Sequence, residues 1–366
     1  MAPRLIFVHP SLLSYRRDFF ERVATEYQGE TIIYFSPTVV GVLSDIKDMP
    51  VWARSIGPIL SILPGVDWQK GAVGIPLERG DILVVSGAPR CLSNLVLLVR
   101  ARMKGVTTIW WGHYHSPTST RMRSALRLAL ARTAHALLFY TGAEVLRYRQ
   151  SVNNQDKRPI HALNNGIDTD PVRLLRVPYV PAVRERAVLF VGRLTAKAEL
   201  RSAIEALAHP DAKGIELHVI GDGPEGEALG LLADDLGVAE RVRWHGATTD
   251  ERRISRVANA CRVFLYPGQV GLSLIHAMAY GLPAVLHDNA NDQMPEYSAF
   301  ESGLTGRCFA RGDTAALAAT LREMIDDFDA LCAFSGESLR RVEDDYNTRA
   351  MSKRLVTLLG ILDSGQ

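Results

Sequence analysis

Short apolar runs alternate with longer amphipathic stretches along the whole chain. Runs that are apolar almost throughout are typical of strands buried in a parallel sheet. We expect such strands at 5–8, 31–35, 81–85, 107–111, 136–140, 159–163, 187–191, 262–266 and 284–287, and strands with exit turns at 215–223 and 241–246. Apolar residues recur with helical spacing at 143–150, 199–208, 250–260, 273–280, 314–328 and 340–362. The alternation predicts an α/β protein with two doubly wound, Rossmann-like halves.

The length of 366 residues predicts two domains rather than one. The sequence Asn-Asn-Gly-Ile-Asp at 164–168 contains residues that tolerate positive φ, so we expect a sharp turn there. Three prolines fall within 171–183, which we interpret as an interdomain linker. We therefore predict an N-terminal domain over 1–175 and a second domain over 176–345, followed by a C-terminal helix at 346–366.

Composition and charge exclude several classes of protein. Hydrophobic residues make up 47% and charged residues 22%, as in ordinary globular proteins, and a net charge of +2 is too small to predict a nucleic-acid partner. The cysteines form no CxxC pair, which favours a reducing compartment over a disulfide scaffold or a zinc site. They are Cys91, Cys261, Cys308 and Cys332. Because neither a signal peptide nor a membrane-spanning apolar run is recognisable, we expect a cytoplasmic protein.

Two segments are candidates for contact with a membrane surface. The apolar, proline-punctuated segment 56–66 is interpreted as a loop resting on a membrane or on the other domain. Segment 118–134 is a candidate basic amphipathic helix, in which arginines interleave with leucines and methionine. Such a helix binds anionic headgroups with its basic residues. The alternative is an ordinary surface helix with arginines facing water. The arginines are Arg121, Arg123, Arg127 and Arg132.

The stretch 266–283 is the part of the chain that points most directly to a ligand. Pro267 and Gly268 end an apolar strand, Gly271 opens a short helix, and Gly281 with Pro283 ends it. A strand, a glycine turn and a helix N-terminus together present unpaired backbone N–H groups and the positive end of a helix dipole. We therefore predict that this corner binds an anion or a polar sugar.

Four motifs in order give the chain a specific resemblance. Gly-Arg-Leu at 192–194, Gly-Asp-Gly-Pro at 221–224, the stretch at 266–283 and Met-Pro-Glu at 294–296 resemble the donor half of a family-4 retaining glycosyltransferase. The resemblance implies the GT-B fold, in which two Rossmann-like domains face each other across a cleft and the C-terminal helix crosses back to the first domain. It also implies an enzyme that moves a sugar from a nucleotide-sugar donor to a hydroxyl acceptor with retention at the anomeric carbon. The basic helix predicted at 118–134 and the bacterial character of the sequence favour polysaccharide biosynthesis, with a lipid-linked or cell-surface polysaccharide as acceptor.

The same resemblance assigns roles to residues of the second domain. Arg193, next to Gly192, and Lys197 are expected to hold the donor diphosphate in place of a metal ion, so no metal or other cofactor is expected. Lys197 stands one residue before the commonest position, which Ala198 occupies. Trp244 and Gly246 mark the segment that clasps the nucleotide base. Glu296 is expected either to meet a donor hydroxyl or to cap a helix that starts there.

The stretch at 266–283 also departs from the common family pattern, which has two glutamates eight residues apart. Gly268 and His276 stand at those positions, as in a branch that resembles VGLSxIHAxxxGLP. His276 is still expected to hydrogen-bond a ribose hydroxyl. The donor sugar then depends on a carboxylate from elsewhere, on the Gln269 side chain or on backbone N–H groups. Those N–H groups belong to Gln269, Val270, Gly271 and Leu272.

On the acceptor side, two groups are candidates in the first domain. His113 follows the predicted strand at 107–111, and in open α/β sheets ligands sit at the carboxyl ends of strands. The resemblance implies a histidine near the transferring sugar at a comparable position, so we expect the neutral imidazole of His113 there, with His115 as second choice, unless it only satisfies a buried turn. The charges at 16–18 either touch an acceptor or are solvated at a helix start.

Two rival functions remain open from the sequence. One is a catalytically inert sugar-nucleotide-binding partner subunit, which the loss of a glutamate at Gly268 suggests. The other is a UDP-sugar epimerase of the same fold. Such epimerases generally use carboxylates and histidines in the cleft, and the sequence offers few candidate carboxylates. A peripheral position on the inner face of the membrane goes with the transferase hypothesis if the acceptor is lipid-linked.

Overall fold

The computed structural model describes residues 2–39, 42–43, 49–88, 90–114 and 131–364. The chain forms two compact units, residues 1–164 with 348–366 and residues 165–347. The first unit thus ends at Asn164, before the boundary at 175 that the sequence predicts. The proline-containing segment 171–183 belongs to the second unit. Pro171 lies in the first turn of α5 (Asp170–Leu175), and Pro181 starts η2 (Pro181–Val183), so these prolines belong to helix starts rather than to a linker.

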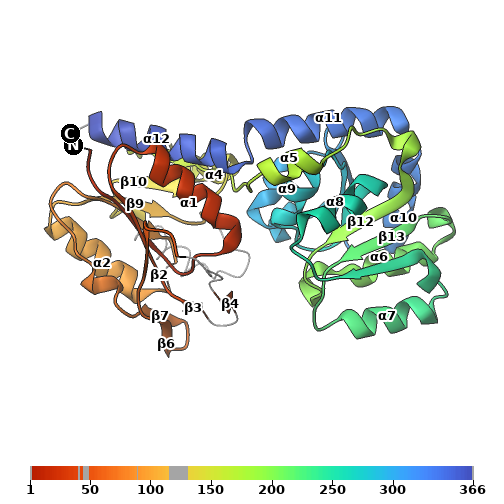
Figure 1. The fold of residues 1–366 in the computed structure, drawn as a ribbon, viewed down its shortest axis with the longest axis horizontal. Coiled ribbons are helices and arrows are strands. Elements are labelled where there is room, and N and C mark those ends of the chain that lie inside the picture. Colours follow the sequence, from red (N-terminus) through yellow and green to blue (C-terminus); the bar gives the residue numbers. More distant parts are fainter. Residues whose placement is uncertain (1, 40–41, 44–48, 89, 115–130, 365–366) are drawn as a thin grey trace. The chain divides into compact units, whose positions relative to one another are not determined.

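The first unit is built on a parallel sheet of seven strands in the order β11-β10-β9-β8-β1-β2-β5. The strands are β1 (Leu5–His9), β2 (Thr31–Phe35), β5 (Ala53–Ser55), β8 (Ile82–Ser86), β9 (Thr107–Trp111), β10 (Ala136–Phe139) and β11 (Ile160–Ala162). Alternate residues of the central strands face opposite layers, so Leu5 and Phe7 pack in one core and Ile6 and Val8 in another. Figure 1 shows α1 (Ser14–Glu26) on one face and α2 (Leu92–Met103) on the other, and α4 (Gly142–Ser151) follows β10.

The last helix, α12 (Thr348–Ser364), packs on α1 and completes the first unit. Thr348 donates to Asp18 Oδ2 at 2.5 Å, and Ser352 donates to Glu26 Oε2 at 2.7 Å. The segment 340–362, which the sequence predicts as one helical region, therefore spans two helices, because α11 (Phe328–Asp344) ends before α12 begins. The side chain of Asn347 donates to the carbonyls of Val342 and Glu343, which caps α11. The predicted return of the C-terminal helix to the first domain is confirmed.

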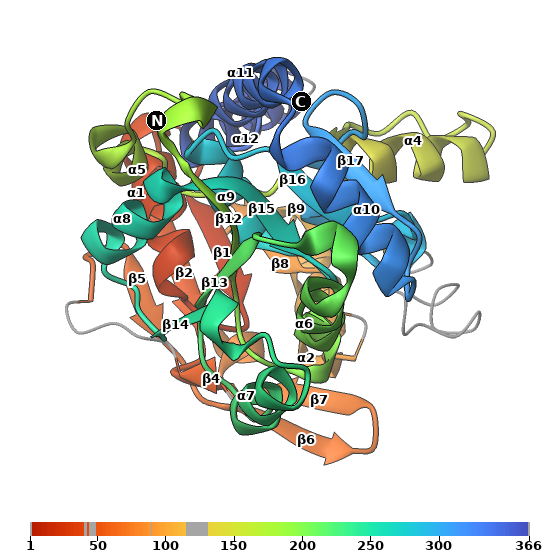
Figure 2. The same cartoon turned by 90° about the vertical axis from the view of Figure 1, so that its right-hand side faces the viewer.

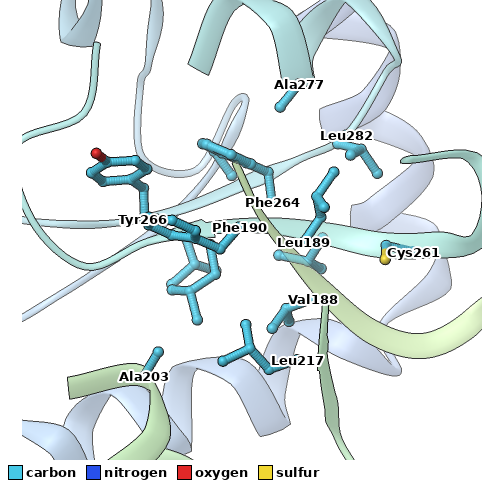
Figure 3. Close-up of a cluster of buried hydrophobic side chains, with 14 of the residues drawn as sticks. Val188, Leu189, Phe190, Ala203, Leu217, Cys261, Phe264, Tyr266, Ala277 and Leu282 are labelled. Atoms are coloured by element: carbon cyan, nitrogen blue, oxygen red, sulfur yellow. The ribbon is translucent and has the colours of Figure 1, made fainter. Parts of the chain in front are cut away.

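The second unit carries a parallel sheet of six strands in the order β14-β13-β12-β15-β16-β17. The strands are β12 (Glu185–Val191), β13 (Glu216–Ile220), β14 (Val242–Gly246), β15 (Cys261–Tyr266), β16 (Ala284–His287) and β17 (Gly306–Phe309). The helices are α6 (Leu200–Ala208), α7 (Gly226–Asp235), α8 (Glu251–Ala260), α9 (Leu272–Ala279) and α10 (Thr314–Ile325), besides α5 and α11. Helices cover both faces of this sheet, as Figure 2 shows. The core side chains of the two central strands are almost fully buried (Figure 3).

Segment 56–66 is not the loop that the sequence predicts. It contains β6 (Ile59–Leu63), which pairs antiparallel with β7 (Val66–Gln69) around a turn in which Gly65 has a φ of +82°. Pro58 and Pro64 flank β6 and remove no hydrogen-bond donor from its ladder, so the proline pattern misled the prediction. Two further strands of two residues, β3 (Thr38–Val39) and β4 (Val42–Leu43), form a separate pair.

The predicted helix at 118–134 lies outside the described residues except for 131–134, and His115 lies outside them as well. Within the described ranges, no helix combines the length and the apolar character that crossing a bilayer requires.

Candidate functional site

The two central strands of the second sheet, β12 and β15, end side by side. β13 lies beyond β12 and β16 lies beyond β15, so the winding of the chain reverses between them. At such a switch point the loops after two neighbouring strands diverge and leave room for a ligand. Those loops are 192–198 and 267–271, which carry most of the residues that the sequence assigns to a donor.

The two loops touch at Gly268, and this contact explains why the position holds glycine instead of the glutamate of the common family pattern. A Cβ atom on Gly268 would lie 2.1 Å from the carbonyl oxygen of Lys197 and 2.8 Å from that of Ala198. The next residue fixes the approach, because the N–H of Gln269 donates to the same Lys197 oxygen at 2.9 Å. No side chain fits at position 268 while this contact exists. The glycine is therefore a steric requirement of this loop pair.

The backbone N–H groups of the second loop divide into bound and open ones. Gln269 N–H is bound to Lys197, and Val270 N–H donates to Gln293 Oε1 at 2.9 Å. Gly271 and Leu272, at the start of α9, have no acceptor for their N–H groups among the described residues. Two of the four predicted N–H groups thus remain for a ligand, where the dipole of α9 favours negative charge.

Gln293, after β16 and directly before the Met-Pro-Glu motif, contacts the second loop, and the sequence analysis gave it no role of its own. Its side chain is buried, with 7% of its surface exposed, and its Oε1 atom orients the loop through Val270. Its Nε2 atom is buried and has no partner among the described residues. A buried amide that lacks an acceptor costs free energy, on the order of 1–3 kcal/mol. The Nε2 group is therefore a donor suited to a ligand hydroxyl or carbonyl.

Two predicted cations, Arg193 and Lys197, differ from Arg311 in whether a carboxylate of the protein binds them. Arg193 and Lys197 are exposed, and in the part of the chain that is described neither has an ion pair or a side-chain hydrogen bond. Arg311, which the sequence analysis did not consider, is engaged instead: it bonds Glu199 at 2.5 Å and also Asp292. Arg193 and Lys197 are thus the cations left for an anion, while Arg311 ties the turn before α6 to the loop after β16.

His276 has a protein partner that the sequence did not predict. Its Nε2 atom lies 2.8 Å from Glu251 Oε1, at the start of α8, and the hydroxyl of Tyr280 donates to the same oxygen at 2.5 Å. Burial raises the pKa of Glu251, but the hydrogen bonds from His276 and Tyr280 outweigh it and lower that pKa overall. The carboxylate fixes the proton on Nε2, which leaves Nδ1 as the ring atom able to accept a bond.

The other predicted donor residues occupy three places in the second unit. Glu296 is buried in a 3-10 turn, η7 (Pro295–Ala299), rather than in an α-helix, and its Oε1 accepts from Asn165. Trp244 is 41% exposed on the edge strand β14, and Gly246 ends that strand with a φ of +69°. Gly192 follows β12, where its carbonyl oxygen would lie 1.9 Å from a Cβ on Gly221. Gly192 thus belongs to the loop pair, and Glu296 makes a contact within the fold.

In the first unit, His113 stands just beyond β9 and is held on two sides. Its ring stacks on Tyr140 with centroids 4.2 Å apart, and its Nδ1 lies 3.5 Å from Glu144 Oε1. Glu144 is itself fixed, since its two oxygens accept from the N–H groups of Tyr114 and Tyr140. The imidazole therefore has a defined orientation at the carboxyl edge of the sheet, while 39% of its side chain stays exposed. This arrangement suits a histidine that contacts a ligand.

Comparison with known proteins finds a family match within the second unit. Residues 185–327 match the family model described as glycosyl transferases group 1. We refer to residues 185–327 as the group 1 domain after this match. The chain is 28% identical over 139 residues to the lipopolysaccharide 1,6-galactosyltransferase of Salmonella typhimurium, which is 36% of this chain and 38% of that protein. The aligned parts cover between 31% and 49% of the length of the curated relatives.

Solved structures show the fold of the whole chain. The sucrose-phosphate synthase of Thermosynechococcus elongatus aligns over 100% of both chains with a TM-score of 0.72 and 16% identity. Anabaena Alr3699/HepE, solved in complex with UDP, aligns over 99% of this chain and 100% of its own with a TM-score of 0.69 and 15% identity. The chain has the GT-B fold, as the sequence predicts.

Two features outside the group 1 domain escaped the sequence analysis. Arg16, expected to touch an acceptor or solvent, is buried, and its guanidinium lies 5.3 Å from the ring centroid of Trp111. Its Nε has no hydrogen-bond partner among the described residues. His9 lies against the same Trp111 ring, and burial, aided by Arg16, lowers the pKa of His9 to about 4 although the Ser11 carbonyl opposes this. His9 is therefore neutral near pH 7, beside a buried cation.

The residues that sequence reasoning missed share one property. Gln293, Glu251 and Arg311 act through partners that are between 19 and 112 positions away in the chain. No short motif records such pairs. The only local signal is that Gln293 directly precedes the Met-Pro-Glu motif.

Proposed function

We propose that this chain is a retaining glycosyltransferase that moves a sugar from a nucleotide-sugar donor to a hydroxyl of a lipid-linked or cell-surface polysaccharide. The observation that carries the proposal is the loop pair of the group 1 domain. There, the N–H groups of Gly271 and Leu272 stand at a helix start, on a loop bonded to the one that carries Arg193 and Lys197. Among the described residues, these N–H groups have no acceptor and the two cations have no ion-pair partner. This set of groups suits a diphosphate that gains negative charge as a glycosidic bond breaks.

In the proposed mechanism the protein supplies charge and position rather than a nucleophile. Arg193, Lys197 and the open N–H groups stabilise the departing nucleoside diphosphate, so the reaction needs no metal ion. The departing phosphate oxygen accepts the proton of the attacking hydroxyl on the same face, which retains the configuration at the anomeric carbon. His113, oriented by Glu144, accepts or donates a hydrogen bond at the transferring sugar.

Recognition of the donor sugar follows from the contact at Gly268. Because that position has no room for a side chain, a glutamate there cannot hold the sugar hydroxyls. The groups that replace it are the side chain of Gln269 and the buried Nε2 of Gln293. His276 offers Nδ1 to a ribose hydroxyl, since Glu251 holds Nε2. The donor site thus relies on amide and imidazole groups.

The experiment is a donor panel with the full chain. UDP-, GDP- and dTDP-sugars are incubated with and without a lipid-linked glycan acceptor, and nucleoside diphosphate release and product mass are measured, with EDTA present and absent. We expect acceptor-dependent release with one donor, unchanged by EDTA. Binding without turnover for every donor would instead support an inert partner subunit. Conversion of the donor to its epimer would support the rival enzyme class.

Contact with a lipid surface is the second part of the proposal. The predicted helix at 118–134 stays a prediction, but α2 offers support in the described residues. Four apolar side chains are exposed along one stripe of α2, the helix has no acidic residue, and Arg102 and Lys104 lie exposed at its end. Apolar and basic groups together favour an anionic bilayer surface. The stripe consists of Leu92, Val96, Val99 and Met103.

Vesicle sedimentation tests this contact. The wild-type chain is expected to bind vesicles of anionic lipid and to be released by salt. A Val99→Asp, Met103→Asp variant is expected to lose most of that binding, while a Leu146→Asp variant on α4 keeps it. Equal binding by all three would remove α2 from the proposal.

A further inference from the structure

A second cluster of polar side chains lies in the group 1 domain, away from the loop pair. Glu185 and Glu216 are the first residues of β12 and β13, and His218 is two residues further along β13. The register pairs Ala187 with Glu216, so these three side chains project from one face of the sheet, near the amino ends of its strands. The loop pair lies at the opposite, carboxyl edge.

The imidazole of His218 is buried and points one nitrogen at both carboxylates. Its side chain is 5% exposed, and its Nε2 lies 3.4 Å from Glu185 Oε2 and 3.7 Å from Glu216 Oε2. Nε2 makes no hydrogen bond with any described residue. The other nitrogen, Nδ1, lies 3.3 Å from Nε2 of His245 on β14. A bond from Nδ1–H to His245 places the free lone pair of His218 on Nε2, between the carboxylates.

We propose that Glu185, Glu216 and His218 bind a first-row divalent cation of the zinc type. The three ligand atoms lie within 4.8 Å of one another. With metal–ligand bonds of about 2.1 Å in tetrahedral geometry, ligand atoms stand about 3.4 Å apart. The two distances from His218 Nε2, 3.4 and 3.7 Å, are close to that value, and the two carboxylate oxygens lie within 4.8 Å of each other. One imidazole and two carboxylates favour Zn²⁺ over Mg²⁺ or Ca²⁺, and a water fills the fourth position.

Arg243 is the group that competes with the ion. Its Nε lies 2.6 Å from Glu216 Oε2, so the guanidinium already neutralises one of the ligands. Its side chain is 53% exposed and is free to turn into solvent when the ion binds. The bound ion links β12 to β13, which carry Gly192 and Gly221 at their other ends. It therefore stabilises the sheet that supports the loop pair, without touching the donor residues.

The test uses the full chain freed of metal by a chelator, with Zn²⁺ alone as probe. Isothermal titration is expected to give one Zn²⁺ per chain, and saturating Zn²⁺ is expected to raise Tm by roughly 5 °C. Mg²⁺ is expected to leave Tm unchanged. In His218→Gln the affinity for Zn²⁺ is expected to fall at least about a hundredfold, and in Arg243→Gln it is expected to rise several-fold because the competing cation is gone.

A matched control is His209→Gln, since His209 also stands beside a carboxylate, that of Asp211, in the same domain. Its affinity for Zn²⁺ is expected to equal that of the wild type. Circular dichroism and Tm without metal show that each variant folds. The proposal is overturned if the folded His218→Gln chain binds Zn²⁺ as the wild type does, or if Arg243→Gln binds none.

Discussion

The carboxyl edges of the two sheets bear different kinds of groups. In the group 1 domain the edge is built from backbone: Gly268 lies against Lys197, and N–H groups and exposed cations face outward. In the first unit the edge is built from side chains, with His113 held by Glu144 and Tyr140. A backbone edge suits a multiply charged, rigid group such as a diphosphate, whereas a side-chain edge suits discrimination among hydroxyls. The difference matches the proposed division between donor and acceptor.

The largest loss of turnover is expected from a substitution that disrupts the backbone contact at the edge of the group 1 domain. In Gly268→Ala the added methyl meets the Lys197 oxygen, so the two loops separate and the cations lose their position. We expect turnover to fall by roughly a hundredfold, measured as nucleoside diphosphate release. Gly230→Ala on α7, where nothing lies within 4 Å of the new Cβ, is the control and is expected to keep full activity. Full activity in both variants would contradict the role of the contact.

The next effect removes one charge from the same edge. Arg193→Ala is expected to lower kcat at least about tenfold, because a charge-assisted contact with the leaving group is lost. Arg201→Ala on α6, an exposed arginine paired with Glu205, is the matched control and is expected to keep the wild-type rate. An unchanged rate for Arg193→Ala in a folded chain would count against the proposed donor contact.

A smaller effect is expected at the side-chain edge. Glu144→Gln keeps the shape of the side chain but removes the charge that orients His113, so we expect a several-fold loss in kcat/KM for the acceptor. KM for the donor is expected to stay unchanged, and the several-fold loss is smaller than the fall in kcat of at least about tenfold that is expected for Arg193→Ala. If the donor KM changes instead, the two edges do not divide the substrates as proposed.

The smallest effect concerns stability and its pH dependence. The pKa of Glu251 is lower in the folded chain than its ordinary value of 4.5, so its bonds with His276 and Tyr280 stabilise the fold above that pH. This contribution is lost as the pH falls below about 4.5 and the carboxylate becomes protonated. Glu251→Gln is therefore expected to lower the free energy of unfolding by about 1 kcal/mol at pH 7, and by less at pH 4, in urea titrations. A constant difference would contradict the charged bond.

Much of the fold could be predicted from the sequence, because buried parallel strands are written as contiguous apolar runs. The ranges 31–35, 107–111 and 284–287 were predicted as strands with the bounds that the structure gives. The hairpin at β6 and β7 was missed, since prolines beside an edge strand look like loop signals. The predicted boundary at 175 lies after the end of the first unit at Asn164 for a similar reason, because prolines at the starts of helices were interpreted as a linker.

The sequence by itself determined the alternation of strands and helices, the glycine corner at 266–283 and the identity of the candidate cations. Each of these depends on the period of side chains or on a few adjacent residues. Only the tertiary structure decided that Gly268 is required by Lys197, that Glu251 holds His276, and that His218 faces two carboxylates. Those contacts join residues of different strands and helices, and their distances are fixed by how the sheet and its loops pack.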